Sequence, residues 1–203
     1  MDNIYINKRI RNNNNEFKGL NMKGLILLAN HFEDIEALAT IDLLRRAKIE
    51  IDLVSVVESN KLITQSGIKI ETDLNYKDIN LNDYNFLIIP GGKATFENNL
   101  SSPIVKNIVE HFNNKKQLIA CICAAPMILG QMGYLKGLPY ICFPSCEDDQ
   151  FEGIYQENKK VIVVNNYITS KAAGTTFEFA YEIIKYLTNE ELAQKTLNNV
   201  YYQ

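Results

Sequence analysis

Cysteine and histidine are scarce in this chain, and their scarcity limits the kinds of site it can hold. Only four cysteines and two histidines occur among 203 residues. So few cysteines argue against a disulfide scaffold and favour a reduced, cytoplasmic setting. The cysteines and histidines do not fall at zinc-ligand spacing, and we therefore expect no metal site.

Long apolar runs and an excess of positive charge are also missing. The longest apolar runs, 24–29 and 118–125, fall far short of the roughly 20 residues that a membrane span needs. The formal net charge is −3, which does not favour a nucleic-acid partner. The hydrophobic share of 46% and the charged share of 22% are those of an ordinary globular protein. We therefore expect neither a membrane nor a nucleic-acid partner.

The first 21 residues differ in composition from the rest of the chain. They are basic, contain the asparagine run 12–15, and have no apolar stretch of signal-peptide length. We expect residues 1–21 to be a disordered leader or an extension upstream of a natural start at Met22. A targeting presequence is the alternative, although such segments are rich in serine and this one has none. Residues 22–203 are then predicted to form a single domain.

Strand-like and helix-like stretches alternate from Met22 onward. Expected strands lie at 24–29, 49–57, 62–63, 68–70, 85–89, 117–121, 140–143, 161–164 and 167–169. Helices are expected at 33–46, after Ser102–Pro103, from 127, and after a capping box formed by Thr175 and Glu178. This alternation predicts an α/β fold with a mostly parallel, doubly wound sheet.

Three segments directly follow expected strands, and they are the candidates for a binding crevice. Ligands of such sheets bind at the carboxyl ends of the strands. The segment after Ala29, the segment Pro90–Gly92 and Cys123 all occupy such positions. One crevice could therefore contain all three.

Cys123 lies where a buried strand changes into a helical pattern, with only Ala124 and Ala125 beside it. The arrangement is like the nucleophile elbow of hydrolytic folds, in which a sharp turn lifts the reactive atom out of the sheet. A helix N-terminus below it would favour the reactive thiolate. The alternative from the local pattern is a buried core thiol, because free cysteine is among the most buried residue types.

Four motifs together resemble the ThiJ/PfpI superfamily, in the branch of the parkinsonism-associated deglycase and its bacterial relatives. They occur in the family's order and at its spacing: 32–36 (FEDIE), 88–92 (IIPGG), 120–126 (ACICAAP) and 169–175 (TSKAAGT). The resemblance covers about Met22 to Asn199. It implies a flavodoxin-like three-layer sandwich, usually a homodimer, that works without metal or organic cofactor.

The resemblance also implies roles for individual residues. Cys123 matches the family's reactive cysteine, and Glu36 matches the carboxyl group that hydrogen-bonds its sulfur. Gly92 and Ala124 match positions whose backbone N–H groups form an oxyanion site, and we assign Gly91, which precedes Gly92 in the same turn, to oxyanion or substrate binding with them. From the residues alone, Glu36 could instead be a helix N-terminal acid in solvent. The two glycines could equally serve a turn that needs positive φ.

Several positions depart from the family's pattern. Ala124 stands where the protease-like branches have histidine, so a Cys–His dyad of that kind is absent. Phe143 stands where the deglycase branch often has histidine, which weakens a general-base role for histidine. His31 replaces a usual glycine, and we expect it to face solvent from a loop, as we do for His111 on a surface helix. Cys146 is expected to be exposed in a polar loop.

Two functions use the same residues. The first is an enzyme that acts on small reactive carbonyls such as methylglyoxal, with Cys123 as nucleophile and Glu36 moving a proton. The second is a redox or oxidative-stress sensor, in which Cys123 is oxidised and Glu36 stabilises the product. The partner is then a small carbonyl compound or an oxidant, and the sequence does not separate the two.

Overall fold

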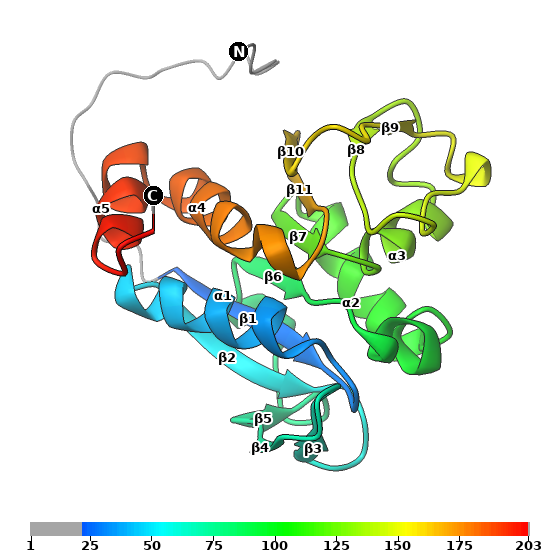
Figure 1. Cartoon of the computed structure of the whole chain (residues 1–203). Helices are drawn as coiled ribbons and strands as arrows, with labels where there is room; N and C mark the ends of the chain where they lie inside the picture. Colours follow the sequence, from blue (N-terminus) through cyan, green and yellow to red (C-terminus); the bar gives the residue numbers. More distant parts are fainter. Residues whose placement is uncertain (1–21, 203) are drawn as a thin grey trace.

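Buried apolar runs form the centre of a seven-stranded sheet in the computed structural model, which describes residues 22–202 (Figure 1). The strand order is β10-β11-β7-β6-β1-β2-β5, and only the β10–β11 pair is antiparallel. The strands are β1 (Lys23–Leu28), β2 (Glu50–Ser55), β5 (Leu74–Asn75), β6 (Phe86–Ile89), β7 (Leu118–Ile122), β10 (Val161–Val164) and β11 (Tyr167–Ser170). The mostly parallel sheet is confirmed. The predicted leader, 1–21, lies outside the described residues.

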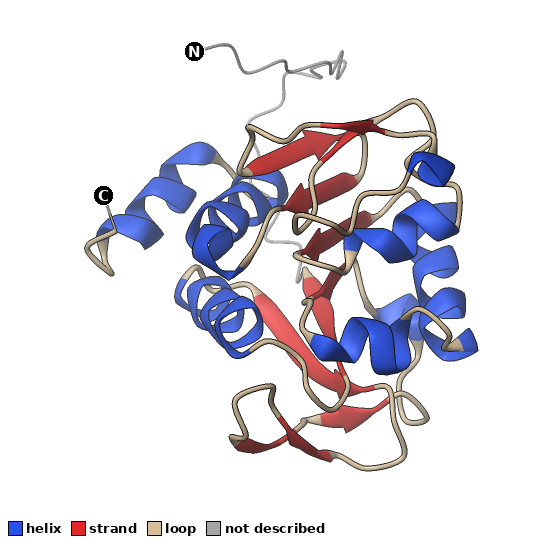
Figure 2. Cartoon of the chain, turned by 45° about the vertical axis from the view of Figure 1, so that its right-hand side comes forward, coloured by secondary structure: helices blue, strands red, loops and turns tan. Residues whose placement is uncertain are grey.

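Helices cover both faces of the sheet (Figure 2). One layer contains α1 (Asp34–Arg46), α4 (Thr176–Leu187) and α5 (Glu190–Asn198), which pack on one another. The other contains α2 (Pro103–Asn114) and α3 (Pro126–Gln131), and α2 packs on β6 and β7. Strands β1, β6 and β7 are buried almost throughout because they lie between the layers. The three-layer α/β sandwich is therefore confirmed.

Two local predictions are wrong. The expected strand 140–143 is limited to β8 (Pro139–Tyr140), which pairs with β9 (Ile154–Tyr155). It ends there because the next backbone N–H groups bond elsewhere: Ile141 donates to Thr169 Oγ1 at 3.1 Å, and Phe143 donates to the Cys123 carbonyl at 2.7 Å.

The predicted capping box at Thr175 and Glu178 is also wrong. The Thr175 hydroxyl bonds instead with Ser170 at 2.7 Å and with the backbone of Ala172, closing the preceding short turn. Glu178 pairs with Lys160 rather than with the cap. The remaining short turns are η1 (Leu81–Asp83), η2 (Thr95–Asn99, a π-helix), η3 (Asp149–Phe151) and η4 (Ala173–Thr175).

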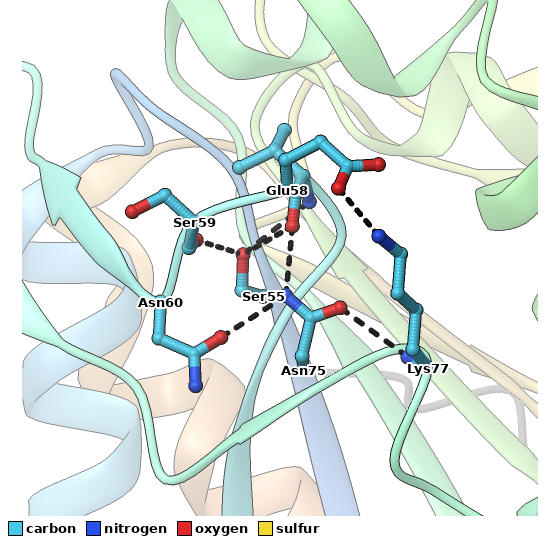
Figure 3. A network of polar contacts seen from close by, with 7 residues as sticks. Ser55, Glu58, Ser59, Asn60, Asn75 and Lys77 are labelled. Carbon is cyan, nitrogen blue, oxygen red and sulfur yellow. Dashed lines mark hydrogen bonds and ion pairs between the residues drawn. The ribbon is translucent and has the colours of Figure 1, made fainter.

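A small antiparallel hairpin, β3 (Lys61–Ile63) and β4 (Lys69–Glu71), projects beside β5. A polar network at its base, shown in Figure 3, holds the incoming loop. Buried Ser55 donates to the carbonyl of Ser59 at 2.7 Å, and buried Asn75 donates to Val57 O at 2.9 Å and Asn60 Oδ1 at 3.0 Å. We call Ser55, Asn60 and Asn75, with the loop carbonyls they bind, the hairpin anchor.

The tip of the hairpin reaches the segment that precedes α1. The His31 N–H donates to the Ile63 carbonyl at 2.7 Å, and Ser66 donates twice to the Asp34 carboxylate. Gln65 accepts from the Lys93 N–H at 2.9 Å. The hairpin therefore braces the loops that follow β1 and β6. Within residues 22–202, no helix has the length and apolar character needed to cross a membrane.

Candidate active site

Three loops meet at the carboxyl ends of neighbouring strands, as the pattern predicted. Strand β6 lies between β1 and β7 in the sheet. The segment Phe32–Glu36 follows β1, Gly91 and Gly92 follow β6, and Cys123 follows β7. The candidate residues, far apart in the chain, are therefore drawn into one cluster by the strand order alone.

Cys123 occupies a strained elbow at the end of β7. Its φ of 65° lies in the left-handed region, which is unusual for a residue other than glycine. Two long-range hydrogen bonds fix this conformation: Cys123 N–H donates to the Ser170 carbonyl at 3.0 Å, and its own carbonyl accepts from Phe143 N–H at 2.7 Å. The residue is partly exposed, so the alternative of a buried core thiol is wrong.

Glu36 lies in the first turn of α1 and is fully buried, at 0% exposure. The N-cap Glu33 accepts from its backbone N–H at 2.8 Å, which sets the start of the helix. The Glu36 Oε2 atom accepts from the Gly91 N–H at 2.8 Å. Among the described residues, Oε1 has no hydrogen-bond partner of normal geometry. Glu36 is therefore not the solvent-facing acid that the helix position also allowed.

Gly91 and Gly92 are required for different reasons. A Cβ on Gly91 would lie 2.7 Å from Cys123 Cβ and 3.0 Å from Glu36 Oε2, so only glycine leaves room for the thiol and the carboxyl together. Gly92 has a φ of 87° and pairs with Phe32 in an isolated antiparallel bridge. The N–H of Gly91 is used by Glu36, so Gly91 orients the carboxyl instead of facing a bound substrate.

The groups around the Cys123 sulfur shift the pKa of the thiol in opposite directions. Burial and the neighbouring Glu36 carboxyl raise the pKa of the thiol, while the backbone N–H groups of Gly92 and Ala124 lower it. The raising effects are larger, so the helix N-terminus does not produce the low thiol pKa expected from the sequence. The N–H groups of Gly92 and Ala124 contact the sulfur, and their role as an oxyanion site stays a prediction.

Glu36 and Cys123 form one coupled acid–base pair. Burial raises the pKa of Glu36 from 4.5 to about 7, although contacts with the Cys123 thiol and the Gly91 N–H lower it. Above that pH the pair carries a single negative charge, which can reside on the carboxylate or on the sulfur. Glutamate can thus accept the thiol proton at the moment that sulfur attacks an electrophile.

The remaining cysteines are less accessible than Cys123. Cys121, Cys142 and Cys146 are all buried, and burial is the first cause that raises the pKa of each thiol. The prediction that Cys146 is exposed is wrong, since only 6% of it is accessible. Its loop turns back through a hydrogen bond from Cys146 N–H to Phe143 O, which places the thiol against the core. Among residues 22–202, no group of three or more potential ligands could hold a metal ion.

The two histidines have different surroundings. His31 does face solvent in part, but its Nδ1 lies 2.6 Å from Glu97 Oε2. His111 is less solvated than predicted: its ring meets Phe112 edge-on, and its Nε2 is buried without a hydrogen-bond partner among the described residues. Phe143 is 46% exposed beside the elbow.

A groove of about 750 Å³ lies at the opposite end of the sheet, where β11 begins and β10 ends. Its walls include Asn113, Tyr134, Tyr167, Glu182 and Tyr186. None of the candidate residues lines it. The cluster around Cys123 is therefore distinct from this groove.

Comparison with known proteins decides the family. The model of the DJ-1/PfpI family matches residues 22–186. The chain belongs to the DJ-1/PfpI family. Protein DJ-1alpha of Drosophila melanogaster is 31% identical over 173 residues, which cover 84% of this chain and 80% of the relative. The Parkinson disease protein 7 homolog of Danio rerio is 29% identical over 84% of this chain and 92% of its own length.

A deglycase and two solved structures are also similar to this chain. Deglycase PfpI of Pyrococcus furiosus is 29% identical over 82% of this chain and 99% of the relative. A DJ-1 superfamily protein of Salmonella typhimurium has a TM-score of 0.84 at 28% identity, covering 90% of this chain and 99% of that one. An oxidised DJ-1 of Toxoplasma gondii has a TM-score of 0.81 at 29% identity, covering 89% and 98%.

The contacts that the sequence did not reveal are mostly made by backbone atoms. The Ser170 carbonyl and the Phe143 N–H hold the elbow, and neither depends on the identity of a side chain. The partner of His31, Glu97, lies in a π-helical turn that has no periodic signature. Only the short spacing between Gly92 and Glu97 hinted that this carboxylate would be near the loop.

Proposed function

We propose that the protein is a cysteine-dependent enzyme that converts small reactive carbonyls, such as methylglyoxal, into hydroxy acids without a cofactor. The observation that carries the proposal is the partly exposed Cys123 thiol, held at a strained elbow beside the buried carboxyl of Glu36. The deglycase relatives support an enzymatic or stress-protective role for the family.

The site supplies each group that the first steps need. The Cys123 sulfur adds to the aldehyde carbon as its proton passes to Glu36, and the N–H groups of Gly92 and Ala124 stabilise the negative charge that develops on oxygen. Glu36 gives the thiol proton to that oxygen, which completes the hemithioacetal, and is a carboxylate again. It then takes the hydrogen of the same carbon as a proton and returns it to the neighbouring carbon, while the hydroxyl proton of the first carbon passes to the oxygen of the second. This transfer converts the hemithioacetal into a thioester. Water hydrolyses the thioester, so the balance is methylglyoxal plus water giving lactate and a proton.

Aldehyde turnover by the wild-type protein beside Cys123→Ser tests this proposal. We expect the substitution to lower the turnover rate by at least about 10³-fold, because a hydroxyl is a far weaker nucleophile than a thiolate. Product formation should be followed by NMR as well as by loss of the aldehyde, since thiols also trap aldehydes without turnover. Turnover that survives in Cys123→Ser would refute the mechanism.

A second candidate is a redox or oxidative-stress sensor. The same Glu36 carboxyl and the same two N–H groups surround the sulfur and would stabilise an oxidised form of Cys123. Glu36→Gln keeps a hydrogen-bond donor but removes the exchangeable proton, so it separates the two functions. Loss of turnover with normal peroxide oxidation of Cys123 favours the enzyme. Peroxide oxidation unchanged in Glu36→Asp would argue that Glu36 does not act on the sulfur.

We also propose a homodimer in the cytoplasm. Ile35, Ile63 and Ile68 are 51%, 43% and 51% exposed, on segments joined by the Asp34–Ser66 hydrogen bonds. Exposed apolar side chains gathered in this way suit contact with a second copy. The four free thiols accord with a reducing compartment. Analytical ultracentrifugation of the wild-type protein and Ile63→Asp tests the dimer.

A further inference from the structure

The proposed reaction has one step for which Glu36 is badly placed, namely the hydrolysis of the thioester. The attacking water must come from solvent and must lose a proton as its oxygen bonds to carbon. Glu36 is 0% exposed, and its carboxyl is hydrogen-bonded to the Gly91 N–H. A second acid–base group on the solvent side would complete the site.

His31 and Glu97 form a solvent-exposed histidine–carboxylate pair on the two segments that meet at the Phe32–Gly92 bridge. Their side chains are 44% and 51% exposed, and His31 Nδ1 lies 2.6 Å from Glu97 Oε2. A carboxylate only accepts hydrogen bonds, so the Nδ1 atom beside Glu97 carries a proton. In the neutral ring, Nε2 is then the proton acceptor. Among the described residues, the hydrogen bond of the His31 ring is made by Nδ1 and not by Nε2.

The backbone places this pair against the loop that contacts the reactive sulfur. The His31 carbonyl accepts from Ala94 N–H at 3.1 Å, and Phe32 forms the bridge with Gly92. A Cβ on Gly92 would lie only 2.7 Å from the His31 carbonyl oxygen. His31 is therefore next to the loop whose Gly92 N–H acts on the Cys123 thiol.

Both residues have unusual backbone conformations. His31 has a φ of 65°, in the left-handed region. Glu97 lies in the π-helical turn Thr95–Asn99, a rare element that occurs often at functional sites. The strain at His31 is held in place by the hydrogen bond from its N–H to the Ile63 carbonyl of the hairpin.

We propose that His31, oriented by Glu97, is the general base that activates water for hydrolysis of the Cys123 thioester; this inference rests on the proposed function. The water oxygen bonds to the thioester carbon as its proton passes to His31 Nε2. The carbon–sulfur bond breaks, and its electron pair leaves with the Cys123 sulfur. His31 then releases its proton to solvent, and the thiolate regains one through Glu36.

The test separates formation of the thioester from its hydrolysis, with methylglyoxal as substrate. The variants are His31→Asn, because asparagine tolerates positive φ, and Glu97→Gln, which removes the orienting charge. His111→Gln is the matched control, since His111 lies on α2 near the edge where β7 begins. Rapid-quench mass spectrometry measures the thioester, and NMR measures lactate.

We expect His31→Asn to lower steady-state turnover about 10²-fold, at the low end of general-base effects. Thioester formation in the first turnover should change less than about threefold, so the acylated enzyme should accumulate. Glu97→Gln should show the same accumulation with a smaller loss of turnover, and His111→Gln should behave as wild type.

Two results would overturn this assignment. One is turnover that depends on Cys123 but is unchanged by His31→Asn, which leaves the proposed function intact. The other is an equal slowing of both steps without accumulation of the thioester, which would indicate a structural effect on the Gly92 loop. Absence of turnover in the wild-type protein would instead remove the proposed function, and this inference with it.

Discussion

Two polar clusters at the carboxyl ends of the strands are built in opposite ways. In the hairpin anchor, the buried side-chain donors of Ser55 and Asn75 have partners at 2.7–3.0 Å. In the Cys123 cluster, buried Glu36 keeps an oxygen without a normal partner, and the cysteine itself has a strained backbone. The anchor is arranged for stability. The Cys123 cluster instead keeps an unsatisfied carboxyl oxygen and a strained cysteine, both of which cost stability.

The difference shows how to distinguish structural from functional polar groups in one sheet. A buried polar group that is fully hydrogen-bonded adds to stability, and one that is not lowers it. A buried ionisable group whose charged form is destabilised is typical of active sites, because its shifted pKa suits it to proton transfer. Substitutions in the two clusters should therefore have opposite effects on stability and activity.

The largest expected effect is on the activity of Glu36→Gln. An amide cannot take the thiol proton, so turnover should fall by about 10²–10⁴-fold. Because burial raises the pKa of Glu36 to about 7, wild-type kcat/KM should rise with pH through that region as the carboxyl loses its proton. The variant should lose this rise. A wild-type profile that falls through pH 7 would contradict the assignment of Glu36 as the base.

The same substitution should stabilise the fold. The raised pKa of Glu36 means that the folded state holds a proton which the unfolded state has released, so ionisation costs stability as pH rises from 4.5 to about 7. Glu36→Gln removes this cost, with a gain of up to about 3 kcal/mol at pH 8. The gain should fall toward zero below pH 4.5. Urea denaturation at several pH values measures it, and a gain that does not vary with pH would exclude this cause.

Asn75→Ala in the hairpin anchor should do the reverse. The substitution removes donors to the Val57 carbonyl and to Asn60 Oδ1, and leaves the Asn60 oxygen without this partner. We expect a loss of about 2 kcal/mol in the free energy of unfolding and less than a threefold change in turnover. A large loss of turnover with little loss of stability in Asn75→Ala would contradict the purely structural role of the hairpin anchor.

The smallest effect should come from the exposed margin of the anchor. Lys77 pairs with Glu58 across the loop in Figure 3, and both side chains are mostly exposed to solvent. Solvent and salt screen such pairs. Lys77→Ala should leave both the urea midpoint and the turnover unchanged within error, and so serves as the control for Asn75→Ala.

The sequence predicted the central strands well because a strand buried on both faces is a continuous apolar run. Strands β1, β6 and β7 are continuous apolar runs, and each leads directly into a candidate loop. The strand order then brings Glu36, Gly91 and Cys123 together, so the core of the site was predictable from position. Their role in catalysis remains a prediction.

The errors concern groups whose partners are distant in the chain. Cys146 lies in a polar segment, but a turn through Phe143 buries it. Thr175 has the spacing of a cap, yet its hydroxyl bonds with Ser170 across the turn. The pairing of His31 with Glu97 spans 66 positions and depends on a π-helical turn. Local patterns carry no information about such contacts.

The position of β6 between β1 and β7 has a consequence for folding. In chain order β1 comes first, β6 next and β7 last, so the middle strand is synthesised before the cysteine-bearing strand. In the folded sheet, the pairing of β7 with β6 places Cys123 beside Gly91. Because burial raises the pKa of Glu36, acquisition of that raised pKa reports burial of the carboxyl, and a refolding experiment could follow it separately from the formation of helices.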